Sequence, residues 1–488
     1  MSKSTSRLIL TIVFIACFTF VYSEPNKYRV IIMTDMTHDD GNSLIRYLYY
    51  SHLFETEAII VTPQLPDYEY NSKEPWQKCQ DILGAYKSEY EQLSKHQDGY
   101  PTYESFKSVT KKGHGALPII WLTNDKKFDK GIAGRHVVTS WGDIKFEDWI
   151  GEGNNPYGLP KDSEGSDFLQ KVFEKDDDRP IYVQMWGGPI AFIQALYRYK
   201  QNHTVTETQK LLSKLHIYGI LLQDITFDFL IDIDEVKKMN CTNFGTTTST
   251  YSGERLNVGW LLHDGGHFWQ YCYSDEEGWT KPMREGDVKG YGPMSNLYDH
   301  GGEGDTPAFL YLLSANLGLN DPLNPTHGSW GNMFKPMGEP FPDGYYHTCG
   351  NDATQLMRWK EDVRNSFLNR LNYSIKAPTN VNHEPQCIVN GNTTNEIMYM
   401  KAAPGSIVTL NASQSIDPDS DKLSFSWFRY DEADNYNGTL LIKNPNKNKI
   451  KLKVPSELHD KEIHIILKIS DNGKPSLCAY RRIIITSN

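Results

Sequence analysis

The sequence has no excess of positive charge, no internal repeat and no low-complexity tract. Its 50 basic and 61 acidic side chains give a net charge of −11, which argues against nonspecific nucleic-acid binding because that needs basic surface. Beyond residues 8–21 it has no apolar run of bilayer-spanning length, so we expect no membrane segment in the mature chain. These absences leave an ordinary acidic globular chain of 488 residues, long enough for two or three domains.

The first 23 residues have the pattern of a cleaved signal peptide. Lys3 and Arg7 precede an apolar run, Leu8 to Val21, and Ser23 closes a triplet like those at cleavage sites. The alternative is a membrane anchor, but the run is short for one. We therefore expect a soluble mature protein that is secreted or resides in the lumen of the secretory pathway.

The cysteines and the glycosylation sequons are consistent with a secreted or lumenal protein. Removal of the signal leaves six of the seven cysteines, and an even number in an oxidising compartment suggests up to three disulfides. Cys387 and Cys478, near the two ends of the C-terminal unit, are the easiest pair to propose. The sequon asparagines, which need surface positions, are Asn202, Asn240, Asn372, Asn392, Asn411 and Asn437.

Residues 24–377 alternate between strand and helix patterns, which predicts βαβ units. The fold class is therefore α/β, an open and mostly parallel sheet with helices on both faces. Residues 378–488 instead read as about seven short strands, typical of an all-β immunoglobulin-like sandwich. The expected strands of the first unit include 28–34, 57–62, 179–186 and 215–222, and its expected helices include 42–53, 76–95 and 205–214.

The most informative segment is Thr34 to Gly41, which contains Asp35, Asp39 and Asp40. It follows the first hydrophobic strand and precedes a helix, at the strand end where open parallel sheets bind ligands. Three carboxylates in six residues repel one another unless a cation compensates, and oxygen ligands favour Ca²⁺ or Mg²⁺. On spacing alone, capping of the helix by Asp39 and Asp40 is an equally good interpretation.

The Asp-x-x-x-Asp-Asp string after the first strand resembles the signature of nucleoside hydrolases. More closely, the chain resembles the secreted "cellulose-binding, nucleoside hydrolase-like" branch, which has a C-terminal Ig-like domain. The similar blocks occur in order through roughly residues 27–486. They include TDMTHDDGNSLIRYLYYS, RPIYVQMWGGP, GEGDTPAFLYLL, GLNDPLNPTHGSWGNMF and DPDSDKLSFSWFRY.

The resemblance implies a role for each aspartate of the cluster. Asp35 would contact a Ca²⁺ ion and act as general base on water, Asp40 would bind the metal through both oxygens, and Asp39 would hydrogen-bond sugar hydroxyls. A backbone carbonyl near Ile190 and a late aspartate would complete the site.

Two residues could supply the late aspartate. Asp305 precedes an apolar helix whose start is fixed by Pro307, and we prefer it for that reason. Asp264 follows His263 and mimics the His-Asp pair of the established enzymes more literally.

The sugar pocket departs from the nucleoside hydrolase pattern. Those enzymes place a ribose-contacting Asn after the second strand, where this chain has Val61-Thr62-Pro63, and Ile190-Ala191 stands in place of their Thr-Asn pair. Gln223 and Asp224 end a strand at about the right place and could substitute in binding the substrate. The proton donor is open among His38, His263, His267 and His300.

Two functions follow, with a third, purely structural extracellular role as the weakest. The first is a secreted Ca²⁺-dependent hydrolase of N-ribosyl-like or related glycosidic bonds in a sugar-containing small molecule. The second is a protein that binds a cellulose-like polysaccharide and retains the metal site without turnover. Sugar stacking on tryptophan is possible but packing is the better interpretation for each of Trp186, Trp260, Trp269, Trp279 and Trp330.

Overall fold

The computed structural model describes most of the chain outside the N-terminal segment. The signal segment and Gln223 and Asp224 lie outside the described residues, so the predictions made for them stay predictions. No helix in the described part is long and apolar enough to cross a membrane. The described residues are 27–36, 38–62, 75–113, 136–139, 142–145, 162–220, 258–264, 288–298, 302–338, 343–348 and 354–487.

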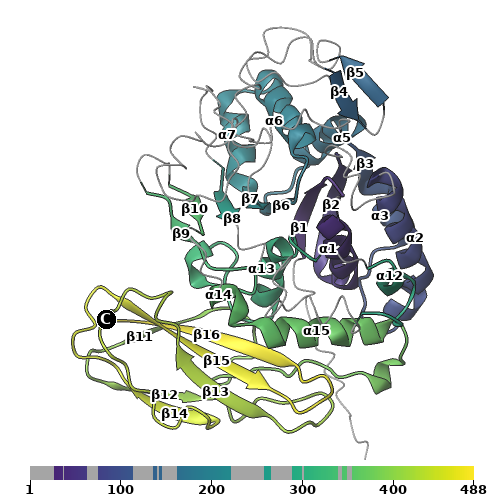
Figure 1. Ribbon diagram of the computed structural model, residues 1–488. Helices are drawn as coiled ribbons and strands as arrows, with labels where there is room; N and C mark the ends of the chain where they lie inside the picture. Colours follow the sequence, from purple (N-terminus) through teal and green to yellow (C-terminus); the bar gives the residue numbers. More distant parts are fainter. Residues whose placement is uncertain are drawn as a thin grey trace, which may run out of the picture.

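An eight-stranded sheet forms the centre of the larger domain (Figure 1). Its order is β3-β2-β1-β6-β7-β8-β10-β9, and all its described pairs are parallel except β9 with β10. The chain order reverses beside β1, so the switch point at which such sheets bind ligands lies between β1 and β6. The strands are β1 (Tyr28–Thr34), β2 (Phe54–Val61), β3 (Thr110–Lys112), β6 (Ile181–Met185), β7 (Leu215–Ile220), β8 (Trp260–Asp264), β9 (Lys335–Pro336) and β10 (Tyr345–His347); β4 (His136–Thr139) and β5 (Gly142–Lys145) form a separate hairpin.

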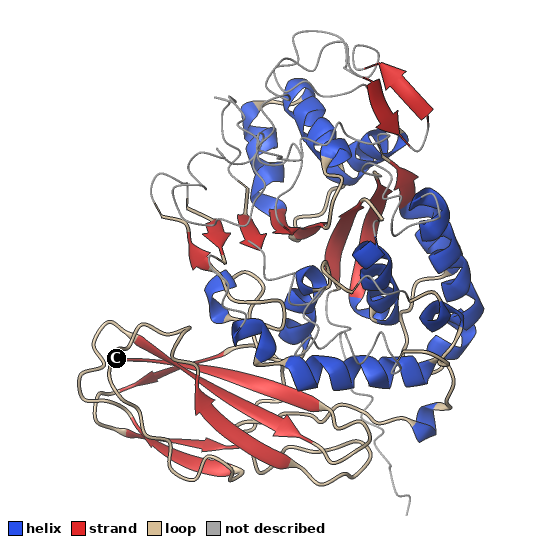
Figure 2. Ribbon diagram, in the orientation of Figure 1, coloured by secondary structure: helices blue, strands red, loops and turns tan. Residues whose placement is uncertain are grey.

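Helices cover both faces of this sheet, as the alternating pattern predicted (Figure 2). Successive strand side chains point to opposite faces, so Ile32 packs in one apolar cluster and Ile31 in the other. The first cluster includes residues of α1 (His38–Tyr49), α2 (Pro75–Leu93), α13 (Pro307–Asn316) and α15 (Lys360–Tyr373), and the second those of α5 (Glu164–Phe173), α6 (Ile190–Asn202) and α7 (Val205–Lys214). The shorter helices are α3 (Tyr103–Val109), α12 (Pro293–Asn296), α14 (Thr354–Met357), η1 (Ser51–Leu53), η4 (Pro325–His327) and η5 (Pro378–Asn380).

The C-terminal region is all β, as predicted, and consists of two sheets around one apolar core. A four-stranded sheet has the order β11-β16-β15-β13, and a two-stranded sheet pairs β12 with β14. Trp427 of the first sheet and Leu452 of the second meet in the core between them. The strands are β11 (Met398–Ala402), β12 (Ile407–Asn411), β13 (Ser424–Arg429), β14 (Lys449–Lys453), β15 (Glu462–Ser470) and β16 (Cys478–Ser487).

The outer face of the four-stranded sheet packs against the larger domain. Tyr430, Ile466 and Tyr480 of the sandwich belong to the same apolar cluster as α1 and α13. The Trp330 indole donates a hydrogen bond to the Tyr480 hydroxyl over 3.2 Å. The fully buried Arg482 guanidinium donates to the carbonyl of Leu319 over 2.6 Å. The two domains therefore share a continuous core.

The proposed disulfide between Cys387 and Cys478 is wrong for this structure, in which both cysteines are free and buried. Cys387 packs in the core between the two sheets, whereas Cys478 packs in the core shared with the larger domain. The thiols thus occupy different apolar clusters. Burial raises the pKa of Cys387 to about 12 and that of Cys478 well above its usual range.

The positions of the tryptophans and of the sequon asparagines bear on two further predictions, sugar stacking and glycosylation. Trp186, Trp260 and Trp330 are at most 3% exposed, so they are core residues and not sugar platforms. Asn372 is only 7% exposed on α15, which leaves no surface for a glycan at that sequon. Trp269, Trp279 and Asn240 lie outside the described residues; Asn202, Asn392 and Asn437 are exposed, and Asn411 is half-buried.

Candidate functional site

The chain leaves β1 through a tight, buried turn that contains Asp35. Met36, the next residue, has φ = 56°, a left-handed conformation that is uncommon for a residue with a side chain. Its amide donates to Thr34 Oγ1 over 3.0 Å and to Asp40 Oδ1 over 3.3 Å. The Thr34 hydroxyl also donates to Asp40. These bonds fix the turn and hold Asp40 close to the end of β1.

Helix α1 begins at His38, earlier than the expected 42–53, and this shift places Asp39 and Asp40 in its first turn. Negative charge is favourable there because the helix dipole is positive at its N-terminus. Stabilisation of the helix start by Asp39 and Asp40 therefore does not exclude metal binding by the same residues, and the metal site stays a prediction. Asp35 and Asp40 are 2% exposed, and Asp39 is half-buried and faces more solvent.

Asp305 joins this cluster from the loop before α13, whose first residue is Pro307. Carboxylate oxygens of Asp39, Asp40 and Asp305 all lie within 4.8 Å of one another. Asp305 Oδ2 is buried and has no hydrogen-bond partner. Burial, and then the charges of the three other aspartates, raise the pKa of Asp305 well above its usual range. The donor set and the orphaned oxygen fit a hard divalent cation, which would let all these groups ionise.

Glycines at the end of β6 bring a second strand against Asp35. A Cβ on Gly187 would overlap the Asp35 carboxylate, so a side chain there would displace it. Gly188 has φ = 57°, and a Cβ there would overlap the backbone of Thr62 at the end of β2. The carboxyl ends of β1, β2 and β6 therefore meet at Asp35. Ile190, whose carbonyl we predicted to bind metal, is the first residue of α6, and its role stays a prediction.

Asp264 lies apart from the cluster. It ends β8, and β6 and β7 separate that strand from β1, which is about 14 Å at normal strand spacing. Its carboxylate accepts hydrogen bonds from Tyr218 over 3.1 Å and from Thr348 over 3.4 Å. The structure thus brings Asp305, and not Asp264, together with Asp39 and Asp40.

Among the candidate proton donors, His263 is the one whose side chain the structure describes. It is fully buried on β8, and burial together with His347 lowers its pKa to about 3. At pH 7 such an imidazole is neutral, and a neutral imidazole is a much weaker acid than the imidazolium form, so His263 is a poor general acid. The side chains of His38, His267 and His300 lie outside the described residues.

A buried ion pair, which the sequence did not predict, connects helix α1, which carries Asp39 and Asp40, with the loop that carries Asp305. Arg46 on α1 and Glu303, two residues before Asp305, are both 0% exposed, and their side chains meet at 2.7 Å. Asn42, one turn before Arg46, donates to the carbonyl of Gly302 over 2.7 Å. Polar residues at i and i+4 within the apolar side of a helix are the sequence signal for such a contact. These bonds position Asp305 against the start of α1.

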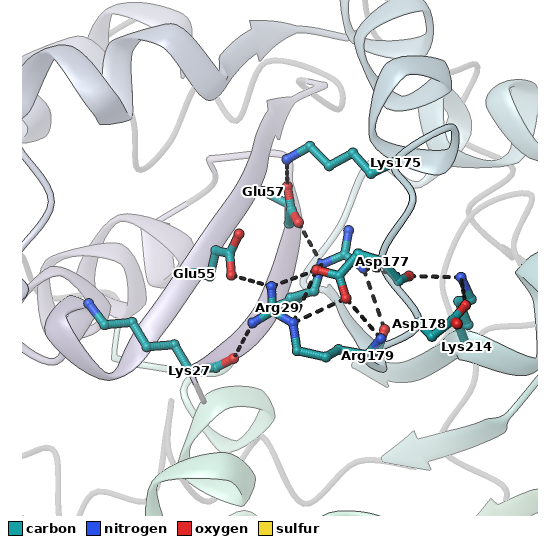
Figure 3. Close-up of polar contacts among 9 residues, drawn as sticks. All are labelled: Lys27, Arg29, Glu55, Glu57, Lys175, Asp177, Asp178, Arg179 and Lys214. Atoms are coloured by element: carbon teal, nitrogen blue, oxygen red, sulfur yellow. Dashed lines mark hydrogen bonds and ion pairs between the residues drawn. The ribbon is translucent and has the colours of Figure 1, made fainter. Parts of the chain in front are cut away.

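A second group of charges lies at the opposite end of the sheet, at the amino ends of β1, β2 and β6 (Figure 3). Arg29 contacts Glu57 at 2.6 Å, and both are at most 2% exposed. Arg179 contacts Asp177 at 2.6 Å and Glu55 at 2.7 Å. Here every acid has a basic partner, so this network connects strands and does not require a cation.

Comparison with known proteins identifies the family. Residues 29–334 match the family model described as "Cellulose-binding Sde182, nucleoside hydrolase-like domain", and residues 407–487 match "Cellulose-binding protein Sde0182, C-terminal domain". The solved structure of a nucleoside hydrolase-related hypothetical protein from Saccharophagus degradans, described as associated with carbohydrate metabolism, is similar with a TM-score of 0.71. Its identity is 29%, over 95% of this chain and 100% of that one.

Two further solved structures are similar to only a small part of the chain. The PKD domain from the KIAA 1837 protein is 14% identical over 19% of this chain and 81% of that one, with a TM-score of 0.15. Mouse protocadherin PcdhgC3 is 18% identical over 19% of this chain and 31% of that one, with a TM-score of 0.13. Curated proteins gave no match. Because the first family model spans more than half of the chain, the protein belongs to the cellulose-binding, nucleoside hydrolase-like family.

Proposed function

We propose that the protein is a secreted, Ca²⁺-dependent hydrolase of N-ribosyl-like or related glycosidic bonds. The observation that supports it is the meeting of Asp39, Asp40 and Asp305, within 4.8 Å, beside Asp35 at the switch point of the sheet. Membership of a nucleoside hydrolase-like family agrees with that chemistry. Secretion rests on the N-terminal signal pattern and on the cellulose-binding description of the family.

The residues that would hold the ion are Asp35, Asp40 and Asp305, with the carbonyl of Ile190. When bound, a divalent cation supplies positive charge that keeps buried carboxylates ionised and polarises the oxygens it contacts. Of these residues, Asp40 and Asp305 belong, with Asp39, to the group of carboxylate oxygens within 4.8 Å of one another, and Asp305 Oδ2 is buried and otherwise unpaired.

Asp35 is the group best placed to take a proton from an attacking water. It is 2% exposed, in contact with Gly187, and located where strands β1 and β6 diverge. Glycosidic cleavage passes through an oxocarbenium-like transition state, which nearby carboxylates stabilise electrostatically. Asp39, which is half-buried, is oriented by the first turn of α1 and would accept hydrogen bonds from sugar hydroxyls.

The first prediction concerns Asp35→Asn, which keeps the shape of the side chain but cannot accept the proton. We expect turnover to fall about 100- to 10,000-fold, the usual contribution of a general base. The measurement is release of free base from a panel of ribonucleosides and of reducing ends from oligosaccharides. Asp98→Asn removes a charge from the exposed surface and should leave the rate unchanged. Full turnover by the Asp35 variant would exclude this mechanism.

The second candidate function is polysaccharide binding without turnover. The observation that favours it is the changed sugar pocket, where Val61-Thr62-Pro63 stands in place of the segment with the Asn of nucleoside hydrolases and the Thr62 hydroxyl is buried and unpaired. The cellulose-binding description of the family agrees with it. We then expect retention of the whole protein on insoluble cellulose and no sugar or base release. Absence of retention would count against this function.

A further inference from the structure

The outer face of the two-stranded sheet β12–β14 is rich in lysine. In β14, Ile450 and Leu452 point into the core of the sandwich, so Lys449, Lys451 and Lys453 point outward and are exposed. Residues two apart in a strand lie about 7 Å apart on the same face, so these ammonium groups form a regular row.

The row continues into the preceding loop. Lys443 and Lys447 are also exposed, and no Asp or Glu occurs between Asp434 and Glu457. Such a concentration of positive charge is unusual in a chain whose net charge is −11. The row therefore creates a local field opposite in sign to that of the whole molecule.

A groove of about 530 Å³ runs beside this row. Its lining includes Lys443, Lys451 and Lys453, together with the aliphatic side chains of Ile407 and Leu441. Ile407 is 67% exposed and Leu441 70% exposed.

The lining contains one acid, Glu457, against three lysines, so the charge of the groove stays positive. Glu457 accepts a hydrogen bond from the Tyr436 hydroxyl over 2.6 Å, and so faces its own neighbour. The groove thus combines two exposed aliphatic side chains with three ammonium groups and one carboxylate.

Lysines on edge strands often serve only to prevent edge-to-edge aggregation. That role does not account for two large aliphatic side chains exposed on the same face, because they would promote association. A flat anionic membrane is a poorer fit than a chain-like ligand, since the surface is concave. A polymer with apolar C–H faces and regularly spaced negative groups matches both components.

We propose that this groove binds an anionic polysaccharide, one with carboxylate or sulfate groups along its chain. The ammonium row pairs with the anionic groups, and Ile407 and Leu441 contact the C–H faces of the sugar rings. This site lies on the C-terminal sandwich and does not depend on the carboxylate cluster near Asp35. It also differs in ligand charge from a site for cellulose, which is neutral.

The test uses the full-length protein with three polymers: heparin as the sulfated probe, polygalacturonate as the carboxylated probe and dextran as the neutral probe. We expect binding to at least one anionic polymer and none to dextran, with affinity falling as salt rises because bound counterions are released. The double variant Lys451→Glu/Lys453→Glu should weaken binding at least tenfold. Lys401→Glu/Lys422→Glu, an equal charge change at exposed positions outside the groove, should change it less than twofold.

Equal weakening by both double variants, or no binding above dextran, would overturn the proposal. Binding of anionic vesicles in place of both polymers would overturn it in favour of a lipid surface. Ile407→Ser/Leu441→Ser supplies a second test that keeps every lysine, and we expect at least a threefold loss. Hydrolysis by the lysine variant stays at the wild-type level, which separates failure of this site from failure of the hydrolase.

Discussion

Asp305 has a buried carboxylate oxygen without a hydrogen-bond partner, and three further aspartates raise its pKa. Such an arrangement destabilises the ionised protein unless a cation is present. The same carboxylate therefore destabilises the metal-free protein, and in the proposed function it would bind the cation.

This balance gives a prediction about Ca²⁺. Saturating Ca²⁺ should stabilise the folded protein, by about 2.7 kcal/mol when its concentration is 100 times the dissociation constant. Asp305→Asn should abolish most of the rise in Tm, measured by calorimetry with and without chelator. Asp264→Asn serves as the matched control, because that buried aspartate lies outside the cluster, and it should keep the rise. The reverse result would assign the late ligand to Asp264.

Residue types near the strand end were predictable from the sequence, but their partners were less so. Asp35, Asp39 and Asp40 are adjacent in the chain, so their proximity follows from local geometry. Asp305 is distant in sequence; Pro307 favoured it over Asp264, and the topology adds that two strands, β6 and β7, separate β8 from β1. The Arg46–Glu303 pair was missed because a single arginine in an apolar helix face does not identify its partner.

At the scale of elements, α2 is anchored to two neighbours through one buried carboxylate. Glu89 accepts hydrogen bonds from the amide of Met294, in α12, over 2.7 Å and from the Tyr49 hydroxyl, in α1, over 2.9 Å. Burial raises the pKa of Glu89 to about 7. A carboxyl whose pKa is higher in the folded protein binds more protons when folded, so its contribution favours folding at low pH.

We therefore predict that stability contributed by Glu89 is present below about pH 4.5 and is lost as pH rises toward 7. The expected size is on the order of 3 kcal/mol across that range. Glu89→Gln cannot ionise, so its free energy of unfolding should decline less between pH 5 and 7. Denaturant unfolding of both proteins at several pH values measures this difference. Parallel curves for the two proteins would show that Glu89 does not titrate there.

Element positions followed from hydrophobic pattern where one face of the element is buried. β1 matches its expected range of 28–34, and α7 its range of 205–214. The expected start of α1 was late because Asp39 and Asp40 were interpreted as residues that precede and cap the helix, whereas they form its first turn. Strands β9 and β10 have two and three residues, too short for periodicity to indicate them.

At the scale of the whole molecule, the two domains meet through buried side chains and not through a flexible hinge. Arg482 on β16 donates to Leu319 O over 2.6 Å and to the carbonyls of His327 and Gly328, all in the larger domain. It also bonds His464 Nδ1 at 2.8 Å. A fully buried guanidinium held by carbonyl groups stabilises the junction only while all of them stay in place.

We predict a single cooperative unfolding transition for both domains in calorimetry. Arg482→Met should lower the free energy of unfolding by about 2–4 kcal/mol, because it leaves buried carbonyls without donors. Arg358→Met removes a more exposed ion pair with Glu432 across the same junction and should cost less than about 1 kcal/mol. Two separate transitions in the wild-type protein would contradict the shared core.

The shared core also sets an order for folding during synthesis. Trp330 and Trp359 belong to the larger domain, yet Tyr480, eight residues from the end of the chain, packs against both. At about 5–20 residues per second, the ribosome releases the last strand several seconds after the larger domain has emerged. Throughout that interval the face formed by Trp330 and Trp359 lacks the cover that Tyr480 provides, so we expect a chain truncated within the sandwich to aggregate more readily than the full chain.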